Sequence, residues 1–314
     1  MIKTIYLVIP CYNEEDVLPE TAKRLNTIIQ GMIDRGVVSD DSSVLFVNDG
    51  SKDNTWQIIK DLHKQNNMFK GIDLSRNRGH QNALIAGLTE ASKYADAVIS
   101  LDADLQDDVN AIEQFIEKYY EGYDVVYGVR SSREKESFFK RFTAESFYKM
   151  MKLLGVDIVF NHADYRLMSR RALEGLDKYK ESNLFLRALV PEIGYPSTTV
   201  EYERNERFAG ESKYPIKKML SFAFDGITSF SIKPIRMVAN CGIIFCLVAI
   251  AFAIWAIIEK IMGNTVSGWT SIMVSIWFVG GALLLGMGVV GEYVGKIYKE
   301  VKNRPRYIIK ERLY

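Results

Sequence analysis

The chain has 314 residues, with 40 Lys and Arg against 39 Asp and Glu and a formal net charge of +1. This balance excludes a globally basic nucleic-acid-binding protein, so no nucleic-acid partner is expected. Cysteines occur at positions 11, 241 and 246 without a Cys-x-x-Cys pair, which argues against a disulfide framework or a zinc site.

The first 130 residues alternate short apolar runs with longer amphipathic stretches. The apolar runs are residues 5–10, 44–48, 71–74, 97–101 and 125–128, and the helical patterns are residues 17–32, 55–66, 82–94 and 112–120. Strands rich in Val and Ile that are separated by helices form parallel sheets covered on both faces, so the pattern predicts an α/β domain. Ligands of such sheets lie beyond the carboxyl ends of the strands.

The chain becomes less regular between residues 133 and 202. An amphipathic helix is expected over residues 138–154, and a polar stretch containing Asp164 follows. From residue 207 to 236, Lys and Arg are mixed with Phe, Met and Ile, a composition typical of a segment that lies in a membrane interface.

Two long apolar runs follow, over residues 237–258 and 269–291, and neither contains a charged residue. Each is long enough to cross a hydrocarbon core of about 30 Å and is apolar on all faces, so we expect a transmembrane hairpin rather than two buried core helices. Basic residues flank the hairpin on both outer sides, whereas the connector 259–268 has one Lys and one Glu. This asymmetry predicts a plasma-membrane protein with both termini in the cytoplasm.

The strongest local pattern is a pair of carboxylates, Asp102 and Asp104, directly after the apolar run 97–101. In a strand-end loop, side chains two residues apart can point at the same cation, and Gln106 can extend the set. Mg2+ takes such oxygen ligands and leaves positions for substrate phosphates. A helix N-cap would explain one acidic residue but not the pair. The pattern therefore predicts a divalent-cation site for a diphosphate leaving group.

Polar loops also follow the first three apolar runs, with the sequences IPCYNEE (9–15), VNDGS (47–51) and SRNRGHQN (75–82). Gly50 permits a sharp turn, and Asp49 is placed to accept a hydrogen bond from a nucleobase or a ribose hydroxyl. An ordinary turn capped by Asp53 is the alternative for Asp49. Tyr12 and Glu14 stand where a base can stack and pair. Because the loops end neighbouring parallel strands, they predict one nucleotide-binding crevice.

Taken in order, these loops resemble the motifs of inverting family-2 glycosyltransferases. With the C-terminal hairpin, the chain is similar to the polyprenyl-phosphate branch, which includes dolichol-phosphate mannose synthases and bacterial undecaprenyl-phosphate sugar transferases. The resemblance spans nearly the whole chain. It implies a Rossmann-like, nucleotide-sugar-binding domain of GT-A type with a mostly parallel sheet, followed by a two-helix transmembrane hairpin.

The resemblance also implies roles for individual residues. Donor binding would fall to Pro10, Tyr12, Glu14, Asp49, Asn77, Asp102, Arg207 and Lys213, the last two in a loop at 207–214 that closes over the donor. Mg2+ or Mn2+ would be held by Asp102, Asp104 and Gln106. The catalytic set would comprise Asp104, Asp164, Arg130 and Arg141, and its two arginines would receive the lipid phosphate. One departure follows Gln106, where the sequence is DDV in place of the bacterial DPP.

A phosphate acceptor needs little help from a base. The second pKa of a phosphate monoester is near 6, so the acceptor is largely a dianion at neutral pH. Such a nucleophile needs positioning and partial neutralisation, which a clamp of Arg130 and Arg141 would supply while in-line attack inverts the anomeric carbon. Asp164 resembles an acidic residue that faces the donor sugar in bacterial relatives. It could orient a sugar hydroxyl, act as a base, or only pair with Arg166.

These patterns divide the chain into four parts. We expect a cytoplasmic catalytic domain at residues 1–206, a juxtamembrane interface segment at 207–236, two transmembrane helices within 237–292, and a basic cytoplasmic tail at 293–314. The tail should favour anionic membrane lipid. Glycine patches at 280–281 and 286–288 permit close helix contact, so a homo-oligomer is also expected.

The expected reaction transfers a hexose or N-acetylhexosamine from a nucleotide-sugar to a polyprenyl phosphate, giving a lipid-linked sugar for cell-envelope glycans. UDP-glucose or UDP-N-acetylglucosamine and undecaprenyl phosphate are favoured, and no motif separates the two sugars. A GDP-mannose-dependent mannosyltransferase and a non-catalytic nucleotide-sugar sensor or scaffold are the alternatives. A processive polysaccharide synthase is disfavoured, because its polymer-gripping motif contains an Arg-Trp dipeptide that this sequence lacks.

Overall fold

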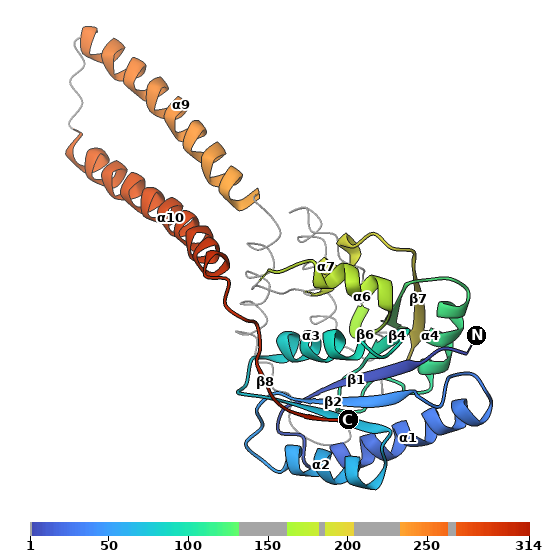
Figure 1. Cartoon of the computed structure of the whole chain (residues 1–314). Coiled ribbons are helices and arrows are strands. Elements are labelled where there is room, and N and C mark those ends of the chain that lie inside the picture. The colour runs from blue at the N-terminus through green and yellow to red at the C-terminus, as the bar shows by residue number, and fades with distance from the viewer. Residues whose placement is uncertain (1, 132–161, 182–185, 204–232, 263–267) are drawn as a thin grey trace. The chain divides into compact units, whose positions relative to one another are not determined.

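The computed structural model describes residues 2–131, 162–181, 186–203, 233–262 and 268–314 (Figure 1). The chain forms two compact units, an α/β unit that includes residues 304–314 and a unit that contains two long helices. The helix expected at 138–154 and most of the segment expected at 207–236 lie outside the described residues.

An eight-stranded sheet forms the centre of the first unit, in the order β7-β5-β6-β4-β1-β2-β3-β8. The strands are β1 (Ile5–Cys11), β2 (Ser43–Asn48), β3 (Phe69–Leu74), β4 (Ala97–Ser100), β5 (Val125–Arg130), β6 (His162–Ser169), β7 (Ser197–Tyr202) and β8 (Ile309–Leu313). β1 runs parallel to β2 and β4, β2 to β3, and β5 to β7, whereas β6 and β8 are antiparallel to their neighbours. The predicted α/β class with a mostly parallel sheet is confirmed, and β1 to β5 coincide with the five apolar runs.

Helices cover both faces of this sheet, as Val- and Ile-rich strands with no polar face require. α1 (Leu18–Asp34), α2 (Thr55–Gln65) and α4 (Ala111–Tyr120) contribute to one core that includes Leu7, Phe46 and Ile99. α3 (His80–Ala91) lies on the opposite face, together with α6 (Arg170–Asp177) (Figure 1). A Cβ added at Gly87 of α3 would lie 2.4 Å from Val8 Cγ1 and 2.7 Å from Val47 Cγ2, so this helix packs directly on β1 and β2.

The strand directions bring the polar loops to one edge of the sheet. β6 is antiparallel to both β4 and β5, so β5 points the same way as β4, β1, β2 and β3. The amino end of β6, which carries Asp164, therefore lies beside the carboxyl ends of β4 and β5. Along this edge the elements follow one another as β5, β6, β4, β1, β2 and β3.

The strand β8 at the C-terminus is not anticipated by the sequence patterns. It pairs with β3, and Leu313 packs against the core beside Gly71. Polar contacts flank the pairing: Lys310 Nζ lies 3.1 Å from Asp73 Oδ2, and Glu311 accepts a 3.1 Å hydrogen bond from Trp56 Nε1. β8 thus covers an edge of β3 that would otherwise offer unpaired backbone groups.

The second unit contains α9 (Lys233–Ile261) and α10 (Trp269–Val301). Each helix contains a window, Ile235–Phe252 or Phe278–Val301, that is long and apolar enough to cross a membrane, and neither window is buried inside the protein. The two helices contact each other where Phe245 and Phe278 meet edge to face at 5.5 Å. A Cβ added at Gly286 would lie 3.3 Å from Val238, so the glycine permits this approach.

Candidate active site

The structure places most of the predicted site residues at the shared edge of the sheet. Pro10 is in β1 and Tyr12 and Glu14 follow it, Asp49 follows β2, Asn77 follows β3, Asp102, Asp104 and Gln106 follow β4, Arg130 ends β5, and Asp164 is near the start of β6. Arg141, Arg207, Lys213 and the loop 207–214 lie outside the described residues.

The loops after β2 and β3 touch each other at Gly50. Gly50 has φ +65°, and a Cβ there would lie 2.5 Å from the backbone nitrogen of Asn77. Asp49 joins the same two loops, because its carboxylate accepts hydrogen bonds from the N–H groups of Arg78 at 2.7 Å and Gly79 at 2.9 Å. Desolvation raises the pKa of Asp49, against the opposing effect of these two N–H donors. Asp49 therefore holds the crevice together, and its contact with a nucleotide stays a prediction.

The loop after β1 is tied to the loop after β2 by backbone-to-side-chain hydrogen bonds. The N–H of Asn13 donates to Ser51 Oγ at 3.0 Å, and the N–H of Glu14 donates to Thr55 Oγ1 at 2.9 Å. Asn13 itself has φ 54°, in the left-handed region that few non-glycine residues adopt. These bonds fix the backbone on which Tyr12 and Glu14, both half-buried, are presented.

The turn after β4 is strained in a way that shapes the carboxylate pair. Leu105, between Asp104 and Gln106, has φ 57°, which is costly for a branched residue. The N–H of Gln106 donates to Asp104 Oδ1 at 3.2 Å and closes the turn. Strain of this kind persists where the surrounding structure imposes it, commonly at ligand sites. The turn leaves Asp102 and Asp104 half-buried at the centre of the edge.

The electrostatics of Asp102 suit a divalent cation. Desolvation is the largest cause that raises its pKa to about 6, and the negative charges of Asp107, Asp164 and Asp104 add to it against the positive charge of His80. Within the described ranges, no three His, Cys, Asp or Glu side chains cluster closely enough to hold a metal alone. Mg2+ commonly binds through one or two carboxylates and completes its shell with water and substrate phosphates, so the carboxylate pair fits such an ion.

His80, at the start of α3, bridges two acidic residues of the site. Its Nε2 lies 3.6 Å from Asp102 Oδ1 and 3.6 Å from Asp164 Oδ2. Desolvation lowers the pKa of His80, but the hydrogen bond to Asp164 and the charges of both aspartates outweigh it and raise the pKa to about 9. The imidazolium thus links the β4 turn to β6. In the sequence, His80 is marked only as one residue of the polar loop 75–82.

Asp164 is surrounded by positive charge. Its Oδ1 lies 2.7 Å from Arg166 Nη2, and its Oδ2 lies 3.5 Å from Arg187 Nη2 and close to His80. Desolvation would raise its pKa, yet Arg187, His80 and Arg166 together hold the pKa of this carboxyl well below its usual range. Such a carboxylate is a weak proton acceptor. The geometry therefore suits a group that orients a partner better than it suits a general base.

Arg130 is held by residues that carried no predicted role. Its Nη2 lies 3.5 Å from Asp107 Oδ1, and the same oxygen accepts a 2.5 Å hydrogen bond from the hydroxyl of Tyr202 on β7. Asp107 is 4% exposed. The first residue of the unusual DDV stretch is thus the buried partner that orients Arg130. No sequence motif marks Tyr202, because its role depends on the pairing of β7 with β5.

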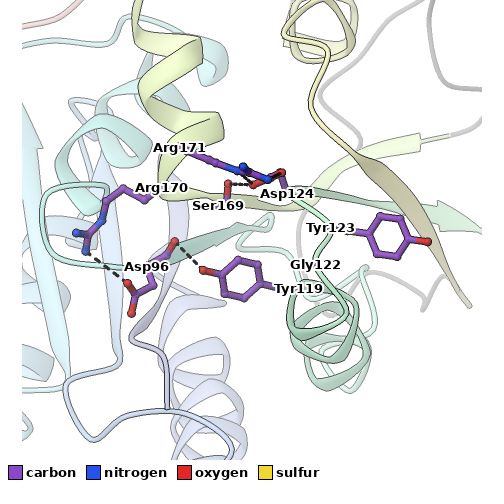
Figure 2. A pocket seen from close by; sticks show the side chains of 8 residues that line it. All are labelled: Asp96, Tyr119, Gly122, Tyr123, Asp124, Ser169, Arg170 and Arg171. Carbon is purple, nitrogen blue, oxygen red and sulfur yellow. Dashed lines mark hydrogen bonds and ion pairs between the residues drawn. The ribbon is translucent and has the colours of Figure 1, made fainter. Parts of the chain in front are cut away.

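A separate pocket of about 270 Å³ lies near the amino ends of β4 and β5, away from this edge. Figure 2 shows its arginines turned toward acidic partners: Arg171 binds Asp124, and Arg170 faces Asp96. Ser169 also donates to Asp124, at 2.7 Å. Because these charges are paired within the pocket, we do not assign the chemistry to it.

Comparison with known proteins agrees with the sequence motifs. Residues 6–177 match the family described as glycosyl transferase family 2. The uncharacterized glycosyltransferase YkoT of Bacillus subtilis (strain 168) is 51% identical over 98% of this chain and 91% of its own length. The SfII prophage-derived bactoprenol glucosyl transferase of Shigella flexneri is 41% identical over 98% of this chain and 97% of its own length.

Similarity to solved structures is more distant. The mannosyltransferase PcManGT from Pyrobaculum calidifontis, solved in complex with GDP-Man and Mn2+, aligns over 96% of this chain and 87% of its own with a TM-score of 0.46 and 15% identity. Mannosyl-3-phosphoglycerate synthase from Rubrobacter xylanophilus aligns over 76% of this chain and 75% of its own with a TM-score of 0.48 and 14% identity. At this level of similarity, neither structure gives information about the substrate or the metal of this chain.

Proposed function

The chain belongs to glycosyl transferase family 2, and from this membership we propose that it transfers glucose from UDP-glucose to a polyprenyl phosphate. Support for the acceptor and the sugar comes from the bactoprenol glucosyl transferases, one of which is 41% identical over 98% of this chain. Undecaprenyl phosphate is the favoured acceptor. The product would be a lipid-linked glucose that later steps of cell-envelope glycan modification consume.

The order of the site residues along the sheet edge supports the proposal independently of sequence similarity. The turn with Asp102 and Asp104 follows β4 at the centre of the edge. The loops proposed to bind the nucleotide follow β1, β2 and β3 on one side, and Arg130 and Asp164 lie on β5 and β6 on the other side. A donor diphosphate at the central turn would thus separate a nucleotide half from an acceptor half.

A divalent cation would be held by Asp102 and Asp104, with Gln106 near them, and Mg2+ and Mn2+ both accept such oxygen ligands. When bound, the ion would neutralise charge that develops on the diphosphate leaving group. The protein's own contribution is to fix the two carboxylates on the strained turn at Leu105. Their crowding with Asp107 and Asp164 is relieved when positive charge arrives.

On the acceptor side, the protein would position a nucleophile that is already ionised. Arg130, oriented by Asp107, would bind phosphate oxygens, and Arg141 is proposed as its partner. Asp164 would accept a hydrogen bond from a sugar hydroxyl and so hold the anomeric carbon in line with the phosphate. We do not assign it the role of base, because the cations around it keep it ionised and weakly basic.

The topology of the chain supports a cytoplasmic catalytic unit. β8 follows α10 and pairs with β3, so the first unit contains strands that precede α9 in the chain and one strand that follows α10. If α9 and α10 each cross the membrane, this unit requires an even number of crossings. The basic residues that flank the two helices support the cytoplasmic side for this unit. We also propose a homo-oligomer, on the glycine patches of α10.

The proposal is tested by transfer into lipid. Membranes containing the full chain are incubated with undecaprenyl phosphate, Mg2+ and labelled UDP-glucose, UDP-N-acetylglucosamine or GDP-mannose, and the organic phase is counted. We expect glucose transfer that EDTA abolishes and that Asp104→Asn lowers by about a hundredfold or more. Asp108→Asn is the matched control in the same segment and should retain activity. Absence of lipid-linked product from every donor, or equal activity of Asp104→Asn and the wild type, would refute the proposal.

A further inference from the structure

Helix α7 (Leu186–Glu192) brings to the site a guanidinium that neither the motifs nor the resemblance single out. Arg187 Nη2 lies 3.5 Å from Asp164 Oδ2, and its side chain is 39% exposed. The other residues of the first turns are buried, namely Leu186, Ala188, Leu189 and Val190. Arg187 is therefore the polar side chain that this helix directs toward Asp164 while its neighbours pack into the protein.

The backbone next to Arg187 is held from two sides. The N–H of Leu186 donates to Gln81 Oε1 at 3.2 Å, and the carbonyl oxygen of Leu186 accepts from Arg166 Nη1 at 3.3 Å. Arg166 is 1% exposed and also pairs with Asp164. One buried guanidinium thus fixes both the start of α7 and the carboxylate that Arg187 faces. These bonds fix the backbone position from which the Arg187 side chain extends toward Asp164.

The sheet order assigns Arg187 to one half of the site. Asp164 lies on β6, next to β5 with Arg130, and on the far side of β4 from the loops that follow β1, β2 and β3. Arg187 faces Asp164 on this side of β4, and its positive charge opposes the raised pKa of Arg130. Arg187 is therefore grouped with Arg130 on the acceptor half, away from the nucleotide loops.

This grouping places two partly exposed guanidinium groups on the acceptor half. His80, Arg166 and Arg187 all face Asp164, and His80 also faces Asp102. Arg130 adds a further cation, and Asp107 offsets it. The side chains of Arg130 and Arg187 are both partly exposed, and a phosphate dianion bound between them would accept charge-assisted hydrogen bonds from each. The arrangement is thus suited to a phosphate that enters between Arg130 and Arg187.

We propose that Arg187 is a further binding residue for the acceptor phosphate, which Arg130 and Arg187 contact together while Asp164 orients the Arg187 guanidinium. The proposal rests on the proposed polyprenyl-phosphate transfer. Guanidinium groups suit a phosphate ligand because each can donate two parallel hydrogen bonds to phosphate oxygens, which an ammonium group cannot.

The test separates acceptor from donor kinetics in the full chain solubilised in mild detergent. Arg187→Ala should raise KM for undecaprenyl phosphate by about tenfold or more, the usual loss for a charged hydrogen bond, and leave KM for UDP-glucose within about twofold. Arg187→Lys keeps the charge but lacks the planar guanidinium group, so its KM for undecaprenyl phosphate should lie between those of the wild type and Arg187→Ala. The matched control is Arg170→Ala, whose side chain is 44% exposed and lies 4.0 Å from Asp96 at the opposite edge. It should leave both constants unchanged.

Two kinetic results would overturn the proposal. A rise confined to KM for UDP-glucose would assign Arg187 to the donor, and unchanged constants in both variants would leave it no binding role. Thermal shift with UDP and Mg2+ checks that each variant is folded, because a ligand that binds only the folded state raises the melting temperature. If Arg187→Ala does not fold, Arg187→Lys decides by the same two constants.

If the wild type transfers no sugar, the proposed function is refuted. The inference about Arg187 is then tested by measuring lipid binding. In that case, undecaprenyl phosphate and undecaprenol are compared as stabilising ligands. The inference stands if the phosphate lipid alone stabilises the wild type and Arg187→Ala loses this stabilisation. It falls if the variant is stabilised as much as the wild type, or if the phosphate gives no advantage over the alcohol.

Discussion

Asp164 and Arg166, two residues apart on β6, form an ion pair with 2.7 Å between Oδ1 and Nη2. Residues at this spacing project from the same face of a strand, so the pair is a local consequence of the extended backbone. Arg166 is 1% exposed, and it can be buried because it shares the charge of Asp164 and donates to Leu186. The pair keeps Asp164 ionised beside the central turn that follows β4.

We predict that the pH dependence of transfer does not originate from Asp164. Its pKa lies well below the usual value for a carboxyl group, so Asp164 is ionised at every pH above about 4. The stability that the ionised form contributes is lost only as pH falls below that value. The acceptor phosphate has its second pKa near 6, and the pKa of Asp102 is also raised to about 6, so the rate should fall as pH drops through about 6. Asp164→Asn should be slower with the same midpoint in a pH-rate profile. Loss of that midpoint in the variant would assign the titration to Asp164.

Gly50→Ala should remove donor binding, whereas Gly36→Ala should not. Both glycines have positive φ, so both variants bear a similar backbone strain of about 1 kcal/mol. Only at Gly50 would the new Cβ meet another loop, 2.5 Å from the nitrogen of Asn77, while nothing lies within 4 Å at Gly36. Calorimetric titration with UDP and Mg2+ measures the difference. Equal binding by the two variants would show that the contact between the loops is not needed.

Tyr202→Phe should weaken the orientation of Arg130. The variant removes the hydroxyl that donates to the buried carboxylate of Asp107 at 2.5 Å. A charged acceptor left without this donor should lower the free energy of unfolding by about 1 to 3 kcal/mol, measured by denaturation in detergent. KM for the lipid phosphate should rise and KM for UDP-glucose should not. Tyr119→Phe is the control, since its hydroxyl donates at 3.4 Å to Asp96 O, near the amino end of β4.

The sheet and its loops could be predicted because their signals are local. β1 to β5 are apolar runs, and the residues after them carry glycine or paired carboxylates whose chemistry is recognisable one loop at a time. Parallel strand order then brings the loops to one edge by a general rule. This rule groups Asp102 with the loops after β1, β2 and β3, whereas Asp164 is assigned to the site only by the family resemblance, because it lies on the antiparallel strand β6.

The partners of these residues could not be predicted, because they depend on pairing between distant segments. Arg187 reaches Asp164 only because Gln81 and Arg166 hold the start of α7. Tyr202 reaches Asp107 because β7 adds to β5 in parallel. Neither residue lies in a motif or beside one. Side chains that position others have weak sequence signals, since many residues could fill the same geometric role.

The strand β8 was missed for a different reason, and it gives the last prediction. Its segment is short and basic, and basic residues after a membrane helix are interpreted as an orientation signal. The alternation of inward and outward residues, which is typical of a strand, is too short to stand out beside that signal. Deleting residues 309–314 should lower the free energy of unfolding by at least about 2 kcal/mol, the value of burying one leucine, because Leu313 and the pairing with β3 are lost.

The exposed edge of β3 should also make the truncated chain self-associate, since unpaired strand edges pair with other chains. Size-exclusion chromatography in detergent measures this directly. Glu311→Ala is the control: it removes the contacts with Trp56 and Lys60 at a solvent-exposed site and keeps the backbone pairing, so it should change little. A truncated chain as stable and as monodisperse as Glu311→Ala would mean that β8 is not part of the folded unit. The even number of membrane crossings inferred from β8 would then lose its structural support.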